Sequence, residues 1–160
     1  MNIKNSYPFL LITLLFTLTT VGCQNKTSDR DLRFVSSYEA IDILGKATGV
    51  FGSQGDEVNI WLDPRSPEEY AEGHIPGALS IPFPLIEQDH KSYLRNAGSI
   101  VVYDTDWDDV IAVSASKRLM ELGYKEVFTL RGGLEAWVAD GNPTEKGAPS
   151  EATEEQAGRR

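Results

Sequence analysis

Residues 100–122 read IVVYDTDWDDVIAVSASKRLMEL, which joins a short apolar run, a polar segment and an amphipathic pattern. The run IVVY over 100–103 is continuous and rich in β-branched residues, so it predicts a fully buried strand. Residues 104–109 predict a loop, and residues 110–122 carry apolar side chains at helical spacing before a terminating Gly123. Ligands of parallel α/β proteins bind at the carboxyl ends of strands, so this loop is the first candidate site.

The same alternation of strand and helix signals continues on both sides of this stretch. Two capping boxes, Ser36 with Glu39 and Ser66 with Glu69, predict helix starts, and Pro67 suits the first helical position. The remaining segments are expected strands at 58–62, 78–81 and 127–130, a polar helical connector over 85–96, and a helix over 134–139. This order predicts an α/β fold with a mainly parallel central sheet and helices on both faces.

The N-terminus predicts a targeting segment rather than a part of the fold. Residues 1–22 combine Lys4, the apolar run FLLITLLF and small residues before Cys23, in the order of a bacterial lipoprotein signal peptide. This resemblance implies cleavage before Cys23 and lipid attachment to its sulfur. Residues 23–33 are then expected to form a tether.

Composition limits the remaining possibilities. The net charge of -9 excludes nucleic acid as a partner recognised through charge, and a single cysteine excludes an intrachain disulfide. Residues 142–160 lack periodicity and are rich in Glu, Gly, Pro and Ala, so they predict a disordered acidic tail. The folded body is therefore expected over residues 34–141.

Residues 61–82 read WLDPRSPEEYAEGHIPGALSIP, which resembles the early signature of the rhodanese-like family. The matching residues are Asp63, Arg65, Glu69, Tyr70, Gly73, His74, Ile75, Pro76, Gly77 and Ala78. The closing pattern of the family is matched by Gly123, Tyr124, Val127, Leu130, Gly132, Gly133, Ala136 and Trp137. The resemblance covers residues 35–140 and implies the three-layer rhodanese fold.

Structural roles are expected for most of these motif residues. Asp63 and Arg65 are predicted to pair at a strand end, and His74 to form a hydrogen bond within its turn. Gly77, together with Gly132 and Gly133, is predicted to serve backbone conformations that a Cβ atom would hinder. Trp137 is expected in the core or at its margin.

Active members of the family use a nucleophilic cysteine directly after the central strand, and the resemblance places Asp104 at that position. A carboxylate cannot form the persulfide intermediate, and Cys23 is expected to be lipidated. Thiosulfate would also be repelled by the acidic loop. We therefore expect no catalytic residue, no cofactor and no sulfurtransferase activity.

The candidate binding loop comprises Asp104, Thr105, Asp106, Trp107, Asp108 and Asp109. Three interpretations remain open for it. Its carboxylates could cap the following helix; Asp104, Asp106 and Asp108 could hold a hard divalent cation; or Trp107 could contact a partner.

These observations together favour a lipid-anchored rhodanese-like domain outside the cytoplasm, facing the periplasm or the cell exterior. The expected role is a binding or scaffold module without sulfurtransferase activity. Its expected partners are the membrane, through lipid on Cys23, and an envelope protein or small ligand. The alternative is an enzyme, either a sulfurtransferase or a metal-assisted hydrolase that uses loop 104–109.

Overall fold

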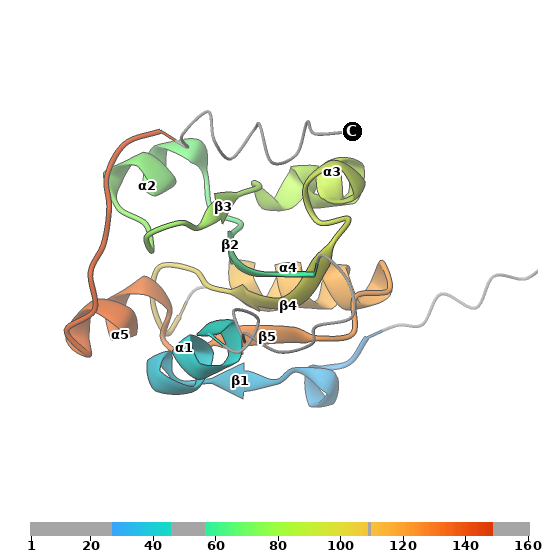
Figure 1. The fold of residues 1–160 in the computed structure, drawn as a ribbon, viewed down its shortest axis with the longest axis horizontal. Helices are drawn as coiled ribbons and strands as arrows, with labels where there is room; N and C mark the ends of the chain where they lie inside the picture. Colours follow the sequence, from blue (N-terminus) through green and yellow to red (C-terminus); the bar gives the residue numbers. More distant parts are fainter. Residues whose placement is uncertain (1–26, 46–56, 109, 149–160) are drawn as a thin grey trace, which may run out of the picture.

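The computed structural model describes residues 27–45, 57–108 and 110–148 (Figure 1). Five strands form one sheet in the order β1-β5-β4-β2-β3, and every neighbouring pair is parallel. The strands are β1 (Phe34–Val35), β2 (Val58–Asp63), β3 (Leu79–Ser80), β4 (Ala97–Val102) and β5 (Val127–Leu130). The helices are α1 (Ser37–Gly45), α2 (Pro67–Glu72), α3 (Ile86–Tyr93), α4 (Ile111–Glu121) and α5 (Gly133–Ala139), with short 3₁₀ turns η1 (Asp29–Asp31) and η3 (Phe83–Leu85).

Strand β4 lies at the centre of the sheet and contributes side chains to two hydrophobic cores. Ile100 and Val102 pack with residues of α3 and α4, whereas Val101 and the following Tyr103 pack with residues of α1, α2 and α5. These four side chains are fully buried. Because successive side chains of a strand point to opposite faces, the apolar run packs into the cores on both faces of the sheet. The predicted three-layer α/β fold with helices on both faces is confirmed.

The predicted helix boundaries follow from local signals. The N–H of Ser66 donates to the Glu69 carboxylate at 3.0 Å, and the N–H of Glu69 donates to the Ser66 hydroxyl at 3.2 Å. Ser36 and Glu39 form the same reciprocal pair at the start of α1. Gly123, with φ +100°, follows the end of α4 in a conformation that favours glycine. The capping predictions are therefore confirmed.

Strand lengths differ from the sequence-based expectation. Strand β4 begins at Ala97 rather than Ile100, since Ala97 pairs with Val58 of β2. Strand β3 is limited to Leu79–Ser80, because only these residues pair with the end of β2. Both limits are set by the neighbouring strand rather than by local composition.

Parts of the expected tether and tail make contacts with the folded body. Two tether residues form ion pairs with the body. The Asp29 carboxylate pairs with the Lys117 ammonium of α4, and the Arg33 guanidinium pairs with Glu126 at 3.1 Å. In the tail, the indole N–H of Trp137 donates to the Pro143 carbonyl at 2.7 Å. Residues 27–33 and 142–148 therefore contact the body through hydrogen bonds and ion pairs.

The remaining terminal predictions lie outside the described residues. These are the signal peptide over 1–22, the lipidation site Cys23 and the tail beyond residue 148. Among the helices that the structure describes, none combines the length and apolarity needed to span a bilayer.

Candidate functional site

Two loops meet at the carboxyl edge of the sheet. One connects β4 to α4 and contains residues 104–108, and the other connects β5 to α5 through Arg131 and Gly132. Both lie on the left in Figure 1, at the opposite edge from the start of β1. The predicted loop therefore occupies the position where parallel α/β proteins bind ligands.

Asp104 is buried at this edge, with a relative exposure of 3%. Its Oδ2 atom accepts a hydrogen bond from the N–H of Ala112 in the first turn of α4 at 3.1 Å. Its carbonyl accepts one from the N–H of Leu134 in α5 at 2.8 Å. The carboxylate thus satisfies a helix N-terminus, as the capping interpretation predicted.

Two glycines permit the close approach of the two loops. A Cβ atom on Gly133 would lie 2.5 Å from the Asp104 carbonyl oxygen, and one on Gly132 would lie 2.4 Å from the Trp107 ring. Both glycines have positive φ, +56° and +73°. The prediction that these positions exclude a Cβ atom is therefore confirmed, for steric as well as conformational reasons.

The rest of the loop lies along the first turn of α5. The Thr105 carbonyl accepts a hydrogen bond from the N–H of Glu135 at 2.9 Å. Trp107 contacts Gly132 yet remains 63% exposed. Thr105 therefore fixes the main chain, while Trp107 presents a large apolar surface to solvent.

Among the described residues of the loop, Asp104, Asp106 and Asp108 are not grouped as a cation site. Asp104 faces the N–H of Ala112, whereas Oδ1 of Asp106 accepts the N–H of Asp108 at 2.8 Å. Within the described ranges, no group of three or more His, Cys, Asp or Glu side chains is placed to hold a metal ion. Asp109 lies outside the described residues.

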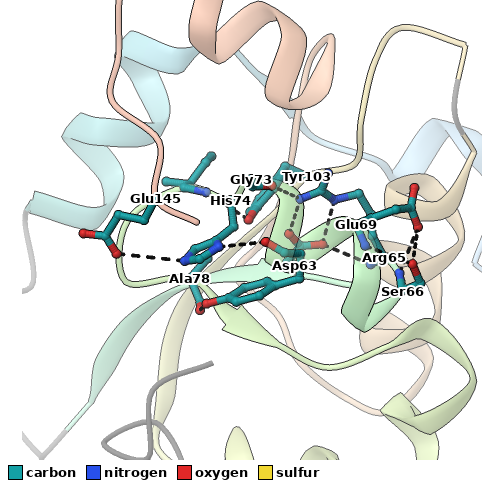
Figure 2. Close-up of polar contacts among 11 residues, drawn as sticks. Asp63, Arg65, Ser66, Glu69, Gly73, His74, Ala78, Tyr103 and Glu145 are labelled. Atoms are coloured by element: carbon teal, nitrogen blue, oxygen red, sulfur yellow. Dashed lines mark hydrogen bonds and ion pairs between the residues drawn. The ribbon is translucent and has the colours of Figure 1, made fainter. Parts of the chain in front are cut away.

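A second polar network lies at the end of β2 (Figure 2). The Arg65 guanidinium donates to both carboxylate oxygens of Asp63, at 2.9 and 2.6 Å, and to the Gly73 carbonyl at 2.7 Å. Asp63 and Arg65 are 0% and 3% exposed. The predicted pairing is confirmed, and it holds the end of α2 against β2.

Burial, hydrogen bonds and charges shift the pKa values of two residues in this network. Burial acts to lower the pKa of Arg65, but the hydrogen bonds and charge of Asp63 outweigh it and raise that pKa. Burial, reinforced by the Asp63 carboxylate, raises the pKa of Tyr103 far above its ordinary value. The Tyr103 hydroxyl therefore stays protonated, and it accepts the N–H of Ile75 at 3.2 Å.

His74 lies on the other side of the network (Figure 2). Its ring stacks on Tyr70, with centroids 3.7 Å apart, and Nδ1 lies 2.9 Å from the Tyr70 carbonyl oxygen. Nε2 is 3.9 Å from the Glu145 carboxylate. The predicted hydrogen bond of His74 is confirmed, and Gly77 adopts a positive φ of +74° in the following turn.

Sequence reasoning missed the contributions of Tyr103 and Glu145. Tyr103 reads as the last residue of an apolar strand, and nothing local signals its contact with Ile75. Glu145 lies in a segment whose composition suggested disorder, although it forms an isolated β-bridge with His74. A buried indole N–H needs a hydrogen-bond acceptor. Trp137 was therefore the available signal that a neighbouring segment of the chain folds back onto the body.

Comparison with known proteins identifies the family to which this fold belongs. The model of the rhodanese-like domain family matches residues 52–140, which is more than half of the chain. The chain belongs to the rhodanese-like domain family. This rhodanese-like domain is 37% identical over 82 residues to a sulfurtransferase of Allochromatium vinosum, covering 51% of this chain and 74% of that protein.

Other relatives are named for a different function. An HTH-type transcriptional regulator of Mycobacterium tuberculosis is 33% identical over 145 residues, covering 86% of this chain. This rhodanese-like domain spans 60% of the regulator's length. The family relationship therefore extends to proteins described by different functions.

Solved structures show the same fold. The crystal structure of a Bacillus halodurans protein has a TM-score of 0.58 at 29% identity and covers 71% of this chain and 77% of that one. The solution structure of a rhodanese-like domain from Anabaena has a TM-score of 0.54 at 29% identity, with coverages of 70% and 77%.

Proposed function

We propose that this protein is a binding module built on a rhodanese-like domain, without sulfurtransferase activity, and lipid-anchored outside the cytoplasm. The observation that carries the proposal is the buried carboxylate of Asp104 directly beyond the central strand, held by the N–H of Ala112. In active members of the family a cysteine thiolate is needed at this place.

The chemistry of sulfur transfer supports the proposal. The transfer needs a thiolate that attacks the outer sulfur of the donor and becomes a persulfide. Cys23 is the only cysteine of the chain. If Cys23 carries a thioether-linked lipid, no thiol remains to accept the sulfur.

The proposed location rests on the order of signals at the N-terminus. A charged start, an apolar run and Gly22-Cys23 follow one another as in bacterial lipoproteins. Incorporation of labelled palmitate by the expressed full chain tests this part of the proposal. We expect labelling of the native chain and none of Cys23→Ser, and labelling of both would contradict it.

Transfer of sulfur from thiosulfate to cyanide tests the missing activity. The mature chain from residue 23, carrying Cys23→Ser, is compared with the same chain carrying Asp104→Cys. We expect the first to be inactive, and turnover by it would overturn the proposal. Gain of activity in the second would show that the loop still supports a nucleophile.

The second candidate function is sulfur transfer itself. It is favoured by the similarity to a protein named as a sulfurtransferase and to a thiosulfate sulfurtransferase of Coxiella burnetii, 31% identical over 77 residues. Such a reaction would have to proceed through Cys23. Activity of the unlipidated chain that disappears in Cys23→Ser would support this alternative.

A further inference from the structure

Trp107 and Val110 are two exposed apolar residues of the segment between β4 and α4. Their relative exposures are 63% and 67%, among the highest of the large apolar side chains that the structure describes. An exposed tryptophan buries much apolar surface when a partner covers it, and tryptophan is enriched among residues that dominate protein interfaces. Stability of the fold therefore does not explain why these two apolar side chains are exposed.

The indole of Trp107 is positioned before any partner binds. A Cβ atom on Gly132 would lie 2.4 and 2.7 Å from Cε2 and Cζ2, so the ring edge rests directly on the glycine backbone. The loop main chain is held by the N–H groups of Leu134 and Glu135, which donate to the carbonyls of Asp104 and Thr105. A side chain already held in place loses less entropy on binding.

Two acidic residues neighbour Trp107, one along the chain and one on α5. Asp108 follows Trp107 directly and is exposed. Glu135 is exposed on the first turn of α5, against which the Trp107 loop lies. The whole chain carries a net charge of -9. An exposed indole with acidic residues close by in the chain and on α5 favours a guanidinium or ammonium group through both cation–π and ionic interactions.

We propose that Trp107, Asp108, Val110 and Glu135 form a docking surface for a protein segment that presents arginine or lysine beside an apolar side chain. The arginine or lysine lies over the Trp107 ring and faces the two carboxylates, and the apolar side chain contacts Val110. The inference rests on the proposed binding function and gives the module a class of partner.

A membrane surface fits these residues less well. The carboxylates of Asp108 and Glu135 repel anionic headgroups. Strand β1, which the N-terminal segment enters, begins at the opposite edge of the parallel sheet from loop 104–108 (Figure 1). The described residues that lead into β1 therefore lie at the opposite edge of the sheet from the docking surface.

Two labelled eight-residue peptides test the proposal, one alternating arginine and leucine and the other glutamine and leucine. Binding to the mature chain carrying Cys23→Ser is followed by fluorescence anisotropy. We expect the arginine peptide to bind, and Trp107→Ala to weaken binding about tenfold. Asp108→Asn with Glu135→Gln should weaken it and reduce its salt dependence. Tyr38→Ala, which removes an 82% exposed aromatic from α1, should leave binding unchanged.

Several outcomes would overturn the proposal. These are absence of binding, equal binding of the glutamine peptide, or equal binding to the Trp107→Ala variant. If that variant does not fold, Val110→Ser replaces it, since Val110 is exposed. Binding of phosphatidylglycerol vesicles that depends on Trp107, without binding of the arginine peptide, would assign the surface to a membrane instead. The sulfur-transfer assay on the same samples separates this result from failure of the proposed function.

Discussion

The carboxylate of Asp104 caps a helix that begins seven residues later, because its Oδ2 atom lies 3.1 Å from the main-chain nitrogen of Ala112. The side chain of Val110, which stands at the N-cap position, provides no cap for α4. The loop folds back so that its first residue performs this role. Asp104 therefore has a structural task that depends on its charge and its burial.

Replacing Asp104 by alanine should destabilise the fold. The N–H of Ala112 loses its acceptor in a buried place, which we expect to cost about 0.5–2 kcal/mol of unfolding free energy. Urea denaturation measures the change. Asp108→Ala removes the same charge from an exposed position of the same loop and should have little effect. Equal effects of the two substitutions would contradict the capping role.

The buried pair of Asp63 and Arg65 should be far more sensitive than a surface pair. Arg65→Met leaves the Asp63 carboxylate buried without its partner, which should cost about 3–5 kcal/mol. Arg118→Met removes an exposed contact with Glu87 of 2.9 Å and should cost about 0–1 kcal/mol. Denaturant unfolding of both variants provides the comparison, and similar losses would show that burial of the first pair is unimportant.

Gly132 should tolerate alanine poorly for two separable reasons. Its φ of +73° strains a residue with a Cβ atom by about 1–2 kcal/mol, and that atom would meet the Trp107 ring. Gly141→Ala is the matched control, because Gly141 has φ +81° and open space around its Cβ position. We expect Gly132→Ala to lower the unfolding free energy more than Gly141→Ala.

Adding Trp107→Ala to Gly132→Ala should recover part of the excess loss, since the ring is removed. The nearby Cβ of Ala136 remains at 2.8 Å from the new atom, so recovery should be incomplete. No recovery in the double variant would show that Trp107 does not rest on this glycine.

Acid should destabilise the fold partly through His90. Burial lowers the pKa of His90 from its ordinary value of 6.5, and Lys91 adds to this effect. Because the folded state disfavours the charged form, the unfolded chain binds more protons at mildly acidic pH. The contribution of His90 is therefore complete above about pH 6.5 and is lost as the pH falls through the lowered pKa.

Unfolding free energies at about pH 7 and pH 5.5 test this contribution. We expect the native chain to lose more stability on acidification than His90→Gln. The carboxylates of Glu39 and Glu69, whose pKa values are lowered by hydrogen bonds from Ser36 and Ser66, contribute their own loss at lower pH in both chains. An identical slope in the two proteins would contradict the assignment to His90.

The segment over 142–148 should contribute to stability. Removing residues 142–160 deprives the buried Trp137 indole of the Pro143 carbonyl and His74 of Glu145, which we expect to cost about 1–3 kcal/mol. Removing only residues 149–160 leaves these contacts in place and provides the control. The same unfolding free energy in both truncated chains would show that the contacts are dispensable.

The helix starts and the buried strand were predictable, because the residues that determine them are close together in the sequence. The paired signals of Ser66 with Glu69, and of Ser36 with Glu39, each lie within one helical turn. The buried strand is visible from its continuous apolar run, and the pairing of Asp63 with Arg65 follows from the resemblance of their motif. The location of loop 104–108 at the carboxyl edge follows from the parallel topology that strand–helix alternation implies.

Signals local to the sequence account for the strand–helix order, the helix caps and the aspartate beyond the central strand. The packing of distant segments is what makes Asp104 the cap of α4 and seats Trp107 on Gly132 while it stays exposed. Residues 142–148 likewise acquired their contacts only in the fold. The physical reason is that hydrogen bonds and close packing between distant segments depend on how the layers meet, whereas caps and apolar runs depend on neighbouring residues.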